Sequence, residues 1–594
     1  MKTDWNLGLL FKNEREILAE RKVVEQKTNA FVKKWEGRDD YLKDPKVLRQ
    51  ALDEYNEWAS KWGTGTREDY YYSLKSSLDQ NDPKIKAAVN KIEEFSTRLG
   101  NTIQFFSLRI SKIDKKLQPK FLKDKELLPY KHFLEKLFEQ ADHLLTEPEE
   151  KILNSVSPLT YSNWTRMVSG FLAKEEREIL DDKGKKSTKT FSEISSLTAS
   201  TNKKVRDTAA KAFDDIMAKH VESAENEINA ILQYKKLGDE LRHYDRPDQS
   251  RHRSDDIDTE VVDTLVTTVT KRFDIAKQYY SLKAKLFKVK KLEYHERNVP
   301  YGTLDKKYSY EEAKNLVMKV FTNLDNEFAM IFAKFQEQGQ IDVFSKKGKQ
   351  HGAFCASQTL TTPTYILLNH TELLNDVLTL AHELGHGINN ELMRARENEL
   401  NYGTPVSTAE VASNFMEDFV LQELAQEADD ELRLSLQMMK LNDDISSIFR
   451  QIACYNLETD LHKAFREKGY LSKEVIGEIF QKNMKAYMGD AVEQSPGSEN
   501  WWVYWSHIRY FFYVYSYSSG LLISKSLQAE VKKDPKFILK VKEFLASGMS
   551  DSPKNIFAKL GIDITKKSFW DKGLDEVEEL LKDTEKLAKK LKKI

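Results

Sequence analysis

Residues 375–390 read NDVLTLAHELGHGINN, and the interpretation of the rest of the chain depends on this stretch. Within it, apolar side chains recur at the three- and four-residue spacing of one helix face: Val377, Leu378, Ala381, Leu384 and Ile388. The spacing predicts a helix with one buried face. His382 and His386 are four residues apart, so their imidazoles should leave that helix on the same side, one turn apart.

Two imidazoles one turn apart can share a metal ion, each binding zinc through one ring nitrogen at about 2.0 to 2.1 Å. Glu383 lies next to His382, where its carboxylate can accept a proton from an attacking water. The alternative is that two histidines and a glutamate fall at this spacing by chance on a partly buried helix. The helical setting favours a zinc site, because His-Glu-x-x-His on a helix is the pattern of zinc metalloproteases.

A catalytic zinc needs a third protein ligand. Metzincins have a histidine six residues after the second ligand, and Leu392 stands at that position here, which excludes them. The next helix is expected to follow Gly403-Thr404-Pro405 and contains Glu410 and Glu417 on one face. Glu410 is the candidate third ligand, although Ser407-x-x-Glu410 also fits a helix capping box. Glu417 is expected to orient a ligand histidine from outside the metal shell.

The composition of the 594 residues indicates a mainly α protein, since it has only 23 glycines and 13 prolines. The 93 basic and 94 acidic side chains nearly cancel, so no global field would attract nucleic acid or an anionic membrane. Two cysteines give neither a disulfide framework nor a Cys-x-x-Cys clamp, and the apolar run at residues 7–11 is too short for a signal-peptide core. We expect a cytoplasmic protein with no nucleic-acid or membrane partner, and the sequence leaves the oligomeric state open.

Strand patterns interrupt the helical spacing in one region. GAFC at residues 352–355 and TYILL at 364–368 are short, rich in β-branched or aromatic residues and bounded by Gly or Pro. A small β-sheet is therefore expected next to the zinc-binding helix. The polar stretch DDKGKKSTK at 181–189 is the best candidate linker. It suggests an N-terminal helical region, residues 1–190, and a catalytic domain, residues 191–594.

The segment WWVYWSHIRYFFYVYSY at residues 501–517 is rich in aromatic side chains, most of which should pack in a core. If the segment is read as one helix, His507, Tyr510 and Tyr517 fall within an arc of about 80°. Three proton donors on one side could stabilise the oxyanion that forms during peptide hydrolysis.

Several of these stretches are similar to one known family. The chain resembles the thimet oligopeptidase and oligoendopeptidase F family of zinc metallopeptidases, and it is closer to the second branch. The resemblance includes GAFC, YILLN at 365–369, DVLTLAHELGH at 376–386, AEVASNFME at 409–417 and HIRYFFYVYSYSSG at 507–520. It extends to GIDITKKSFW at 561–570 and to the opening WNLGLLF, so it covers nearly the whole chain.

The resemblance implies one zinc ion bound by His382, His386 and Glu410, with Glu383 as general base and proton shuttle. It implies that His507, Tyr510 and Tyr517 contact the substrate and the transition state. It also implies two helical lobes around a deep channel for oligopeptides, with the strand at Gly352, Ala353 and Phe354 binding substrate backbone.

Two positions depart from the family pattern. Asn389 stands where a histidine often follows the second ligand, and Tyr294-His295 stands where many members have Tyr-Asp. The expected function is a zinc endopeptidase of the gluzincin type that cleaves short oligopeptides. The alternatives are a zinc carboxypeptidase or dipeptidyl carboxypeptidase, and a non-catalytic helical peptide-binding protein with a zinc site.

Overall fold

The computed structural model describes residues 2–64, 66–180, 184–302 and 306–594. The chain is 72% helical, and its described strands form one two-stranded and one three-stranded sheet. The mainly α class predicted from the sequence is confirmed, and so is the small sheet beside the helix of residues 375–390.

The chain divides into two compact units, each made of three separate stretches of sequence. Unit 1 comprises Met1–Asp142, Asp305–Glu423 and Glu530–Ile562, and unit 2 comprises His143–Leu304, Leu424–Ala529 and Asp563–Ile594. The boundary expected near residue 190 falls inside unit 2. The division into an N-terminal region and a catalytic domain stays a prediction, because compactness does not report which residues take part in catalysis.

Unit 1 is built mainly from helices, two of which, α2 and α4, begin at an Asp-Pro pair. In α2 and α4 the aspartate side chain accepts from the helix backbone and the proline occupies the first turn, where its missing N–H costs nothing. The helices of unit 1 are α1 Glu14–Trp35, α2 Pro45–Lys61, α3 Arg67–Leu78, α4 Pro83–Ile103, α5 Phe105–Ser111, α6 Gln118–Lys123, α7 Lys131–Ala141, α15 Tyr310–Leu324, α16 Asn326–Gln338, α17 Leu374–Arg396, α18 Val411–Glu427, α23 Ile538–Ala546 and α24 Pro553–Lys559, where α18 runs a few residues past the unit boundary.

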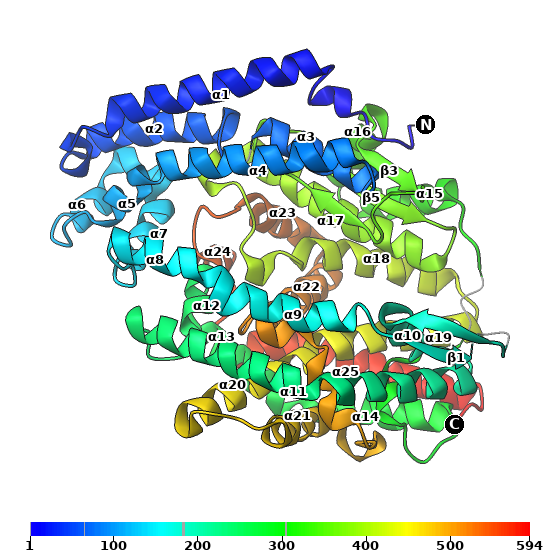
Figure 1. Cartoon of the computed structure of the whole chain (residues 1–594). Helices are drawn as coiled ribbons and strands as arrows, with labels where there is room; N and C mark the ends of the chain where they lie inside the picture. The colour runs from blue at the N-terminus through cyan, green and yellow to red at the C-terminus, as the bar shows by residue number, and fades with distance from the viewer. Residues whose placement is uncertain (1, 65, 181–183, 303–305) are drawn as a thin grey trace. The chain divides into compact units, whose positions relative to one another are not determined.

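The three-stranded sheet of unit 1 has the order β3-β5-β4. β5 (Tyr365–His370) is central and almost fully buried, and it pairs in parallel with β3 (Ile341–Phe344) and antiparallel with β4 (Phe354–Ala356). In the second pair, Phe354 lies opposite Leu367 and Ala356 lies opposite Tyr365. Helix α17 packs against β4 and β5, and α15 and α23 pack against α17 (Figure 1). The sheet therefore supports α17 and leaves β4 at its edge.

The N-terminal segment is fixed to this sheet by hydrogen bonds over more than 300 residues of sequence. The Trp5 indole donates to the Ile366 carbonyl at 2.8 Å, and the Tyr365 hydroxyl donates to the Asn6 carbonyl at 2.8 Å. Their rings pack edge to face with centroids 5.6 Å apart, in an apolar cluster that also contains Phe11 and Tyr70. The first residues of the chain thus belong to the same core as the sheet beneath α17.

Unit 2 is organised around α11 (Lys203–Leu241), a helix of 39 residues whose buried side chains recur along its length. Helices α9 and α10, strand β1, and parts of α20 and α21 pack against it. The other elements of unit 2 are β1 Glu176–Leu180, β2 Lys186–Thr190, α8 Glu147–Ser157, α9 Asn163–Leu172, α10 Phe191–Leu197, α12 Gln249–Ser254, α13 Thr259–Lys271, α14 Phe273–Leu286, α19 Asp430–Asp444, α20 Arg450–Lys468, α21 Lys473–Met488, α22 Tyr515–Lys533 and α25 Lys567–Lys590, where α22 runs a few residues into unit 1.

The prediction of a linker at residues 181–189 is wrong for residues 186–189. Residues 186–190 form β2, which pairs antiparallel with β1 from Glu176 opposite Thr190 to Leu180 opposite Lys186. Residues 181–183 lie outside the described part of the chain. A polar hairpin with one buried residue, Ile179, has a linker's composition, because its strands expose nearly all their side chains.

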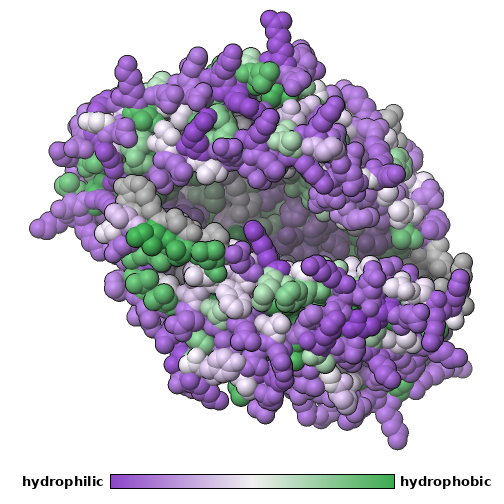
Figure 2. Space-filling model, viewed as in Figure 1, coloured by the Kyte–Doolittle hydropathy of each residue, from purple (hydrophilic) through white to green (hydrophobic). Residues whose placement is uncertain are grey.

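The face of the molecule seen in Figure 2 is mostly hydrophilic, with hydrophobic side chains in small groups. This agrees with a composition in which 31% of residues are charged. None of the described helices is long and apolar enough to cross a membrane.

Candidate functional site

Helix α17 places the two histidines as the spacing predicts. All five side chains of the expected apolar stripe are buried, and the Asp376 carboxylate accepts from the backbone N–H groups of Thr371 (2.6 Å) and Leu373 (3.0 Å) at the helix start. His382 and His386 lie on the opposite side, with side chains 27% and 24% exposed and ring centroids 5.1 Å apart. One buried face therefore turns both imidazoles toward an open cavity.

Glu410 completes a group of three metal-type ligands within unit 1. Its Oε2 lies 3.4 Å from His382 Nε2 and 3.5 Å from His386 Nε2. Ligand atoms about 2.0 to 2.1 Å from a tetrahedral zinc are about 3.4 Å from one another. Glu410 thus already has the separation from each histidine that such an ion requires, all three donor atoms lie within 4.8 Å of one another, and their chemistry, two imidazoles and a carboxylate, suits zinc.

The capping box considered for Glu410 does not form. Glu410 lies just before α18, and its carboxylate accepts from Ser413 Oγ at 2.9 Å as well as approaching both histidines. The Ser407 hydroxyl is buried without a hydrogen-bond partner among the described residues. The side chain that the box would use is directed to the histidines instead.

Glu417 lies in α18, seven residues after Glu410, and contacts the other ring nitrogen of His382. Its Oε2 lies 2.8 Å from His382 Nδ1. A carboxylate can only accept, so Nδ1 is the donor, and when the ring is neutral its lone pair lies on Nε2, the atom 3.4 Å from Glu410 Oε2. The structure thus brings Glu417 to the position in which a carboxylate fixes the orientation of a ligand histidine.

The crowding of carboxylates and imidazoles shifts their pKa values. Burial lowers the pKa of His382, but its hydrogen bonds with Glu410 and Glu417 outweigh this and raise the pKa to about 10. Burial would raise the pKa of Glu410, yet the two histidines hold it well below its usual range. Burial raises the pKa of Glu383, against the attraction of His382 and His386. The site is therefore an anionic environment prepared for a cation, with a carboxylate of raised pKa beside it.

Close packing of α17 on α18 is what allows the two segments to share the site. At Gly385, between the two histidines, an added Cβ would lie 2.6 Å from the Ser413 Cα and 2.7 Å from the Ala412 carbonyl oxygen. Any side chain larger than hydrogen would push the helices apart. The sequence motif contained this glycine, but only the structure shows why it is needed.

A cavity of about 460 Å³ in unit 1 contains these groups. Its lining residues are Ala353, Phe354, Cys355, Ser357, His382, Glu383, His386, Asn390 and Glu410. Ala353 and Phe354, two of the three residues expected to bind substrate, thus line the same cavity as the metal-type ligands. Gly352 is not among them; it has φ +81°, and its carbonyl accepts from Asn369 Nδ2 at 2.7 Å.

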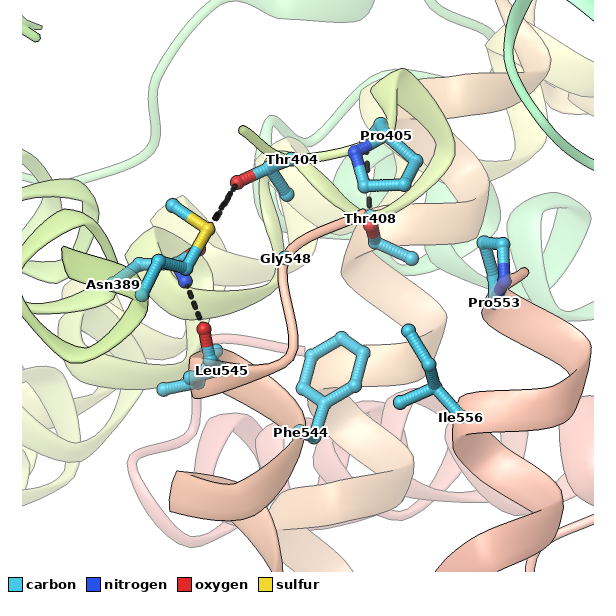
Figure 3. Close-up of a pocket in the computed structure, with 10 residues that line it drawn as sticks. Asn389, Thr404, Pro405, Thr408, Phe544, Leu545, Gly548, Pro553 and Ile556 are labelled. Carbon is cyan, nitrogen blue, oxygen red and sulfur yellow. Dashed lines mark hydrogen bonds between the residues drawn. The ribbon is translucent and has the colours of Figure 1, made fainter. Parts of the chain in front are cut away.

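Asn389, the first departure from the family pattern, is buried and lines a small pocket with Thr404, Phe544 and Leu545 (Figure 3). Its Nδ2 donates to the Leu545 carbonyl at 2.6 Å, near the end of α23, and Thr404 Oγ1 lies 3.5 Å from its Oδ1. Phe544 and Ile556 line the small pocket between these groups. Asn389 therefore joins α17 to α23 and to the loop that leads to Glu410, without touching the metal-type donors.

His295, the second departure, belongs to an ion-pair network in unit 2. His295, Asp207 and Glu296 offer ligand-type atoms within 4.8 Å of one another. Arg206 donates to Glu296 at 2.7 Å, and Lys203 pairs with Asp207 at 2.9 Å. Because these cations already neutralise the carboxylates, the cluster is an ion-pair network and not a second metal centre.

The reading of residues 501–517 as one helix is wrong. The segment contains 3₁₀ turns at Ser498–Val503 and Ser506–Arg509, and α22 begins only at Tyr515. His507 and Tyr517 still meet, with Nε2 3.3 Å from the hydroxyl. Tyr510 is not grouped with them: its side chain is 56% exposed and lines a separate cavity of about 350 Å³ in unit 2. The role of each of these three residues stays a prediction.

Trp505 determines which nitrogen of His507 carries a proton. The Trp505 indole N–H lies 2.9 Å from His507 Nδ1, and an indole can only donate. Nδ1 is therefore the acceptor, and neutral His507 carries its proton on Nε2, toward Tyr517. Burial, together with the nearby Arg450 cation, lowers the pKa of His507 and favours this neutral form. Trp505 is not among the residues predicted from the sequence, where only its position two residues before His507 indicates it.

Comparison with known proteins assigns the chain to a family. Residues 173–576 match the family model described as Peptidase family M3, and residues 109–169 match the one described as Oligopeptidase F. The chain belongs to peptidase family M3. Membership supports metal-dependent peptidase activity on oligopeptides, and it confirms the resemblance found in the sequence.

Named relatives of this M3 chain are about one quarter identical to it. The Oligoendopeptidase F homolog of Lactococcus lactis subsp. lactis (strain IL1403) is 25% identical over 88% of this chain and 87% of its own length. Oligopeptidase PepF of Bacillus subtilis (strain 168) is 27% identical over 86% and 78%.

Solved structures share the fold of this M3 chain. A protein from Chlamydophila abortus superimposes with a TM-score of 0.85 at 22% identity, covering 98% of both chains. Oligoendopeptidase-F from Enterococcus faecium gives a TM-score of 0.71 at 18% identity, covering 97% of this chain and 99% of its own. At these identities the agreement establishes the fold alone.

Substitution Gly385→Ala should separate α17 from α18, because its Cβ would lie within 2.7 Å of both Ala412 and Ser413. We expect a loss of roughly 1–3 kcal/mol in unfolding free energy and a fall of about tenfold or more in zinc affinity. Denaturant unfolding and competition with a chelating dye measure the two effects. Gly238→Ala is the matched control, since nothing lies within 4 Å of its added Cβ in α11. Wild-type zinc affinity in Gly385→Ala would contradict the packing argument.

Substitution Glu417→Gln removes the anionic acceptor at His382 Nδ1, so the ring should lose both its fixed orientation and part of its basicity. We expect zinc affinity to fall about 10- to 100-fold with little change in the unfolding midpoint. Glu337→Gln, at an exposed glutamate of α16, is the control and should bind zinc as the wild type does. Equal zinc affinity in Glu417→Gln and Glu337→Gln would show that Glu417 does not support the metal site.

Proposed function

We propose that this M3 chain is a zinc endopeptidase that cleaves internal bonds of short oligopeptides. The observation that carries the proposal is the convergence of His382, His386 and Glu410 on one point of a cavity. Structural zinc sites are normally closed by four protein ligands, whereas catalytic sites have three and leave one position open. Among the described residues, three donors converge here, which favours the catalytic kind.

When bound, a zinc ion supplies the Lewis acidity that acidifies an attacking water and polarises a peptide carbonyl. Glu383, which lines the same cavity, takes a proton from that water on its carboxylate and later passes it to the leaving amine. Its raised pKa suits both steps, because a more basic carboxylate accepts the proton more readily and is a sufficiently weak acid to hold it until transfer. Glu417 keeps His382 Nε2 directed toward the cavity.

Strand β4 is the proposed contact for substrate backbone. It lies at the edge of the sheet, with β5 on one side, so an extended peptide can add as the next strand. Ala353 and Phe354 line the cavity beside the ligand histidines, and Gly352 precedes them in a left-handed conformation that glycine tolerates. Backbone pairing of this kind reads the length and extension of a peptide more than its sequence.

His507, Tyr510 and Tyr517 are proposed to contact the substrate and the developing oxyanion. Support comes from the tautomer of His507, whose Nε2–H is a donor held in place by Trp505 and Tyr517.

We also propose that the protein is cytoplasmic, in keeping with Cys355 and Cys454, which are both free thiols.

The variant Glu383→Gln tests the assigned base. It keeps the side-chain shape but cannot accept a proton, so turnover of a fluorogenic peptide should fall by at least about 10³-fold while bound zinc, measured by elemental analysis, stays at the wild-type level. Glu337→Gln serves again as the control and should retain full turnover. A Glu383→Gln enzyme of undiminished activity would refute the assignment.

Incubation with a chelator should abolish turnover by the wild type, and added zinc should restore that turnover.

Peptides blocked at both ends separate this proposal from its rivals. An endopeptidase cleaves a peptide that is acetylated at its N-terminus and amidated at its C-terminus, because it needs neither terminal charge. A carboxypeptidase or dipeptidyl carboxypeptidase requires the free carboxylate, and a peptide-binding protein yields no products. Product masses from matched blocked and free peptides decide between the three, and complete resistance of the blocked peptide would exclude the endopeptidase.

A further inference from the structure

Unit 2 contains a turn whose backbone conformation is unfavourable for its sequence. Phe511 and Phe512 both have left-handed backbone angles, with φ of +46° and +57°. Residues other than glycine adopt this region rarely, and bulky side chains are the least tolerant of it. Two consecutive phenylalanines there need support from the surrounding structure, and such strain tends to collect at functional sites.

A buried carboxyl group from a distant helix supports the turn. Glu458 of α20 is 1% exposed, and its Oε2 accepts the backbone N–H of Phe512 at 2.6 Å. The Phe512 ring is fully buried between Tyr455 and His462, at centroid distances of 5.3 Å and 4.9 Å. One helix therefore provides both the hydrogen bond and the packing that hold Phe512.

A second set of hydrogen bonds holds the other side of the turn. Arg251 of α12 donates to the Tyr510 carbonyl at 2.8 Å and to the Phe511 carbonyl at 3.3 Å. The Tyr161 hydroxyl donates to the Arg509 carbonyl at 2.5 Å. Three side chains from different parts of unit 2 thus hold the backbone from Arg509 to Phe512.

The segments that the turn joins are themselves anchored. Before it, Arg509 forms a buried ion pair with Glu227, with a shortest separation of 2.7 Å, which fixes the short helix that carries His507. After it, the Tyr515 hydroxyl donates to Asp255 at 2.9 Å, at the start of the helix that carries Tyr517. The shape of the turn therefore sets how His507 meets Tyr517 across their 3.3 Å contact.

We propose that Glu458 is a positioning residue, which accepts the Phe512 N–H and thereby holds the left-handed turn that keeps His507 and Tyr517 together. This inference rests on the proposed function, because His507 and Tyr517 act there on the substrate. Glu458 itself lies behind the turn and is buried away from solvent, so it acts only through these two side chains.

The protonation state of Glu458 suggests a conservative replacement. Burial raises its pKa to about 8, opposed by the Phe512 N–H and by the Arg251 cation, so the group is mostly neutral at pH 7. Cys454 and His462 on its own helix are also buried, and burial keeps His462 neutral by lowering its pKa. Glutamine, which is neutral and has an acceptor oxygen, therefore reproduces what the carboxyl group supplies.

The experiment compares four variants by peptide turnover. Glu458→Gln should retain kcat within about threefold of the wild type, whereas Glu458→Ala should lower kcat at least tenfold with KM changed less than threefold. Adding Phe511→Gly to Glu458→Ala should recover a substantial part of kcat, because glycine adopts the left-handed region freely. Glu467→Ala, at an exposed position on the same helix, is the control and should behave as the wild type.

A role limited to stability gives a different pattern. In that case Glu458→Ala loses activity in proportion to its unfolded fraction, and Phe511→Gly, which removes another packed ring, lowers it further. That result, or a Glu458→Ala enzyme with kcat within twofold of the wild type, overturns the proposal.

A measurement independent of turnover separates this proposal from the peptidase assignment. The ¹⁵N chemical shifts of the His507 ring report its tautomer and its contact with Tyr517. They should change in Glu458→Ala and stay unchanged in Glu458→Gln. If the wild type cleaves no peptide, the proposed function fails while these shifts still decide whether Glu458 holds the turn; unchanged shifts in Glu458→Ala overturn it.

Discussion

The contact of α17 with α18 at Gly385 is the constraint on which the metal-type site depends. His382 and His386 come from one helix and Glu410 from the segment before the next, yet their donor atoms lie within 3.5 Å of Glu410 Oε2. Side chains of this length reach one another only if the backbones nearly touch, and the backbone of α18 leaves no room for a Cβ at Gly385. The sheet and α23 on other sides of α17 hold it against this contact.

Burial and the close approach of acidic and basic groups together explain the perturbed pKa values. Burial lowers the pKa of His382, but Glu410 and Glu417, with Glu383, outweigh this and raise it to about 10, whereas burial raises the pKa of Glu383. A divalent cation would replace protons in this environment and compensate the repulsion between the carboxylates. Metal binding and folding are coupled in such sites, since ligands that repel one another in the free protein attract a common ion.

The sequence predicted those parts of the protein that depend on local spacing. The helix of residues 375–390, its buried face and the paired histidines follow from the period of 3.6 residues alone, and α17 has all three. Glu410 could be proposed but not distinguished from a capping residue, because the choice depends on which helix lies opposite it. The polar composition of residues 181–189 predicts a linker although residues 186–190 form β2, because strands exposed on both faces lack the alternation that identifies a sheet.

The aromatic segment departs from the helix predicted for it for a different reason. Its residues favour a buried helix locally, but Glu458 and Arg251, distant in sequence, hold Phe511 and Phe512 in a left-handed turn that breaks the helix. No local pattern encodes hydrogen bonds between residues 54 and 260 positions apart. Aromatic spacing could therefore name His507 and Tyr517 but could not show that Tyr510 faces another cavity.

The hydrogen-bond partner at Nδ1 favours opposite tautomers in His382 and His507. Glu417 can only accept, so Nδ1 of His382 donates to it, and in the neutral ring the lone pair lies on Nε2, as a metal ligand requires. Trp505 can only donate, so it occupies the lone pair at Nδ1 of His507 and leaves an N–H at Nε2, as a hydrogen-bond donor requires. The same side chain thus presents an acceptor in unit 1 and a donor in unit 2, and in each case the neighbour at Nδ1 decides which.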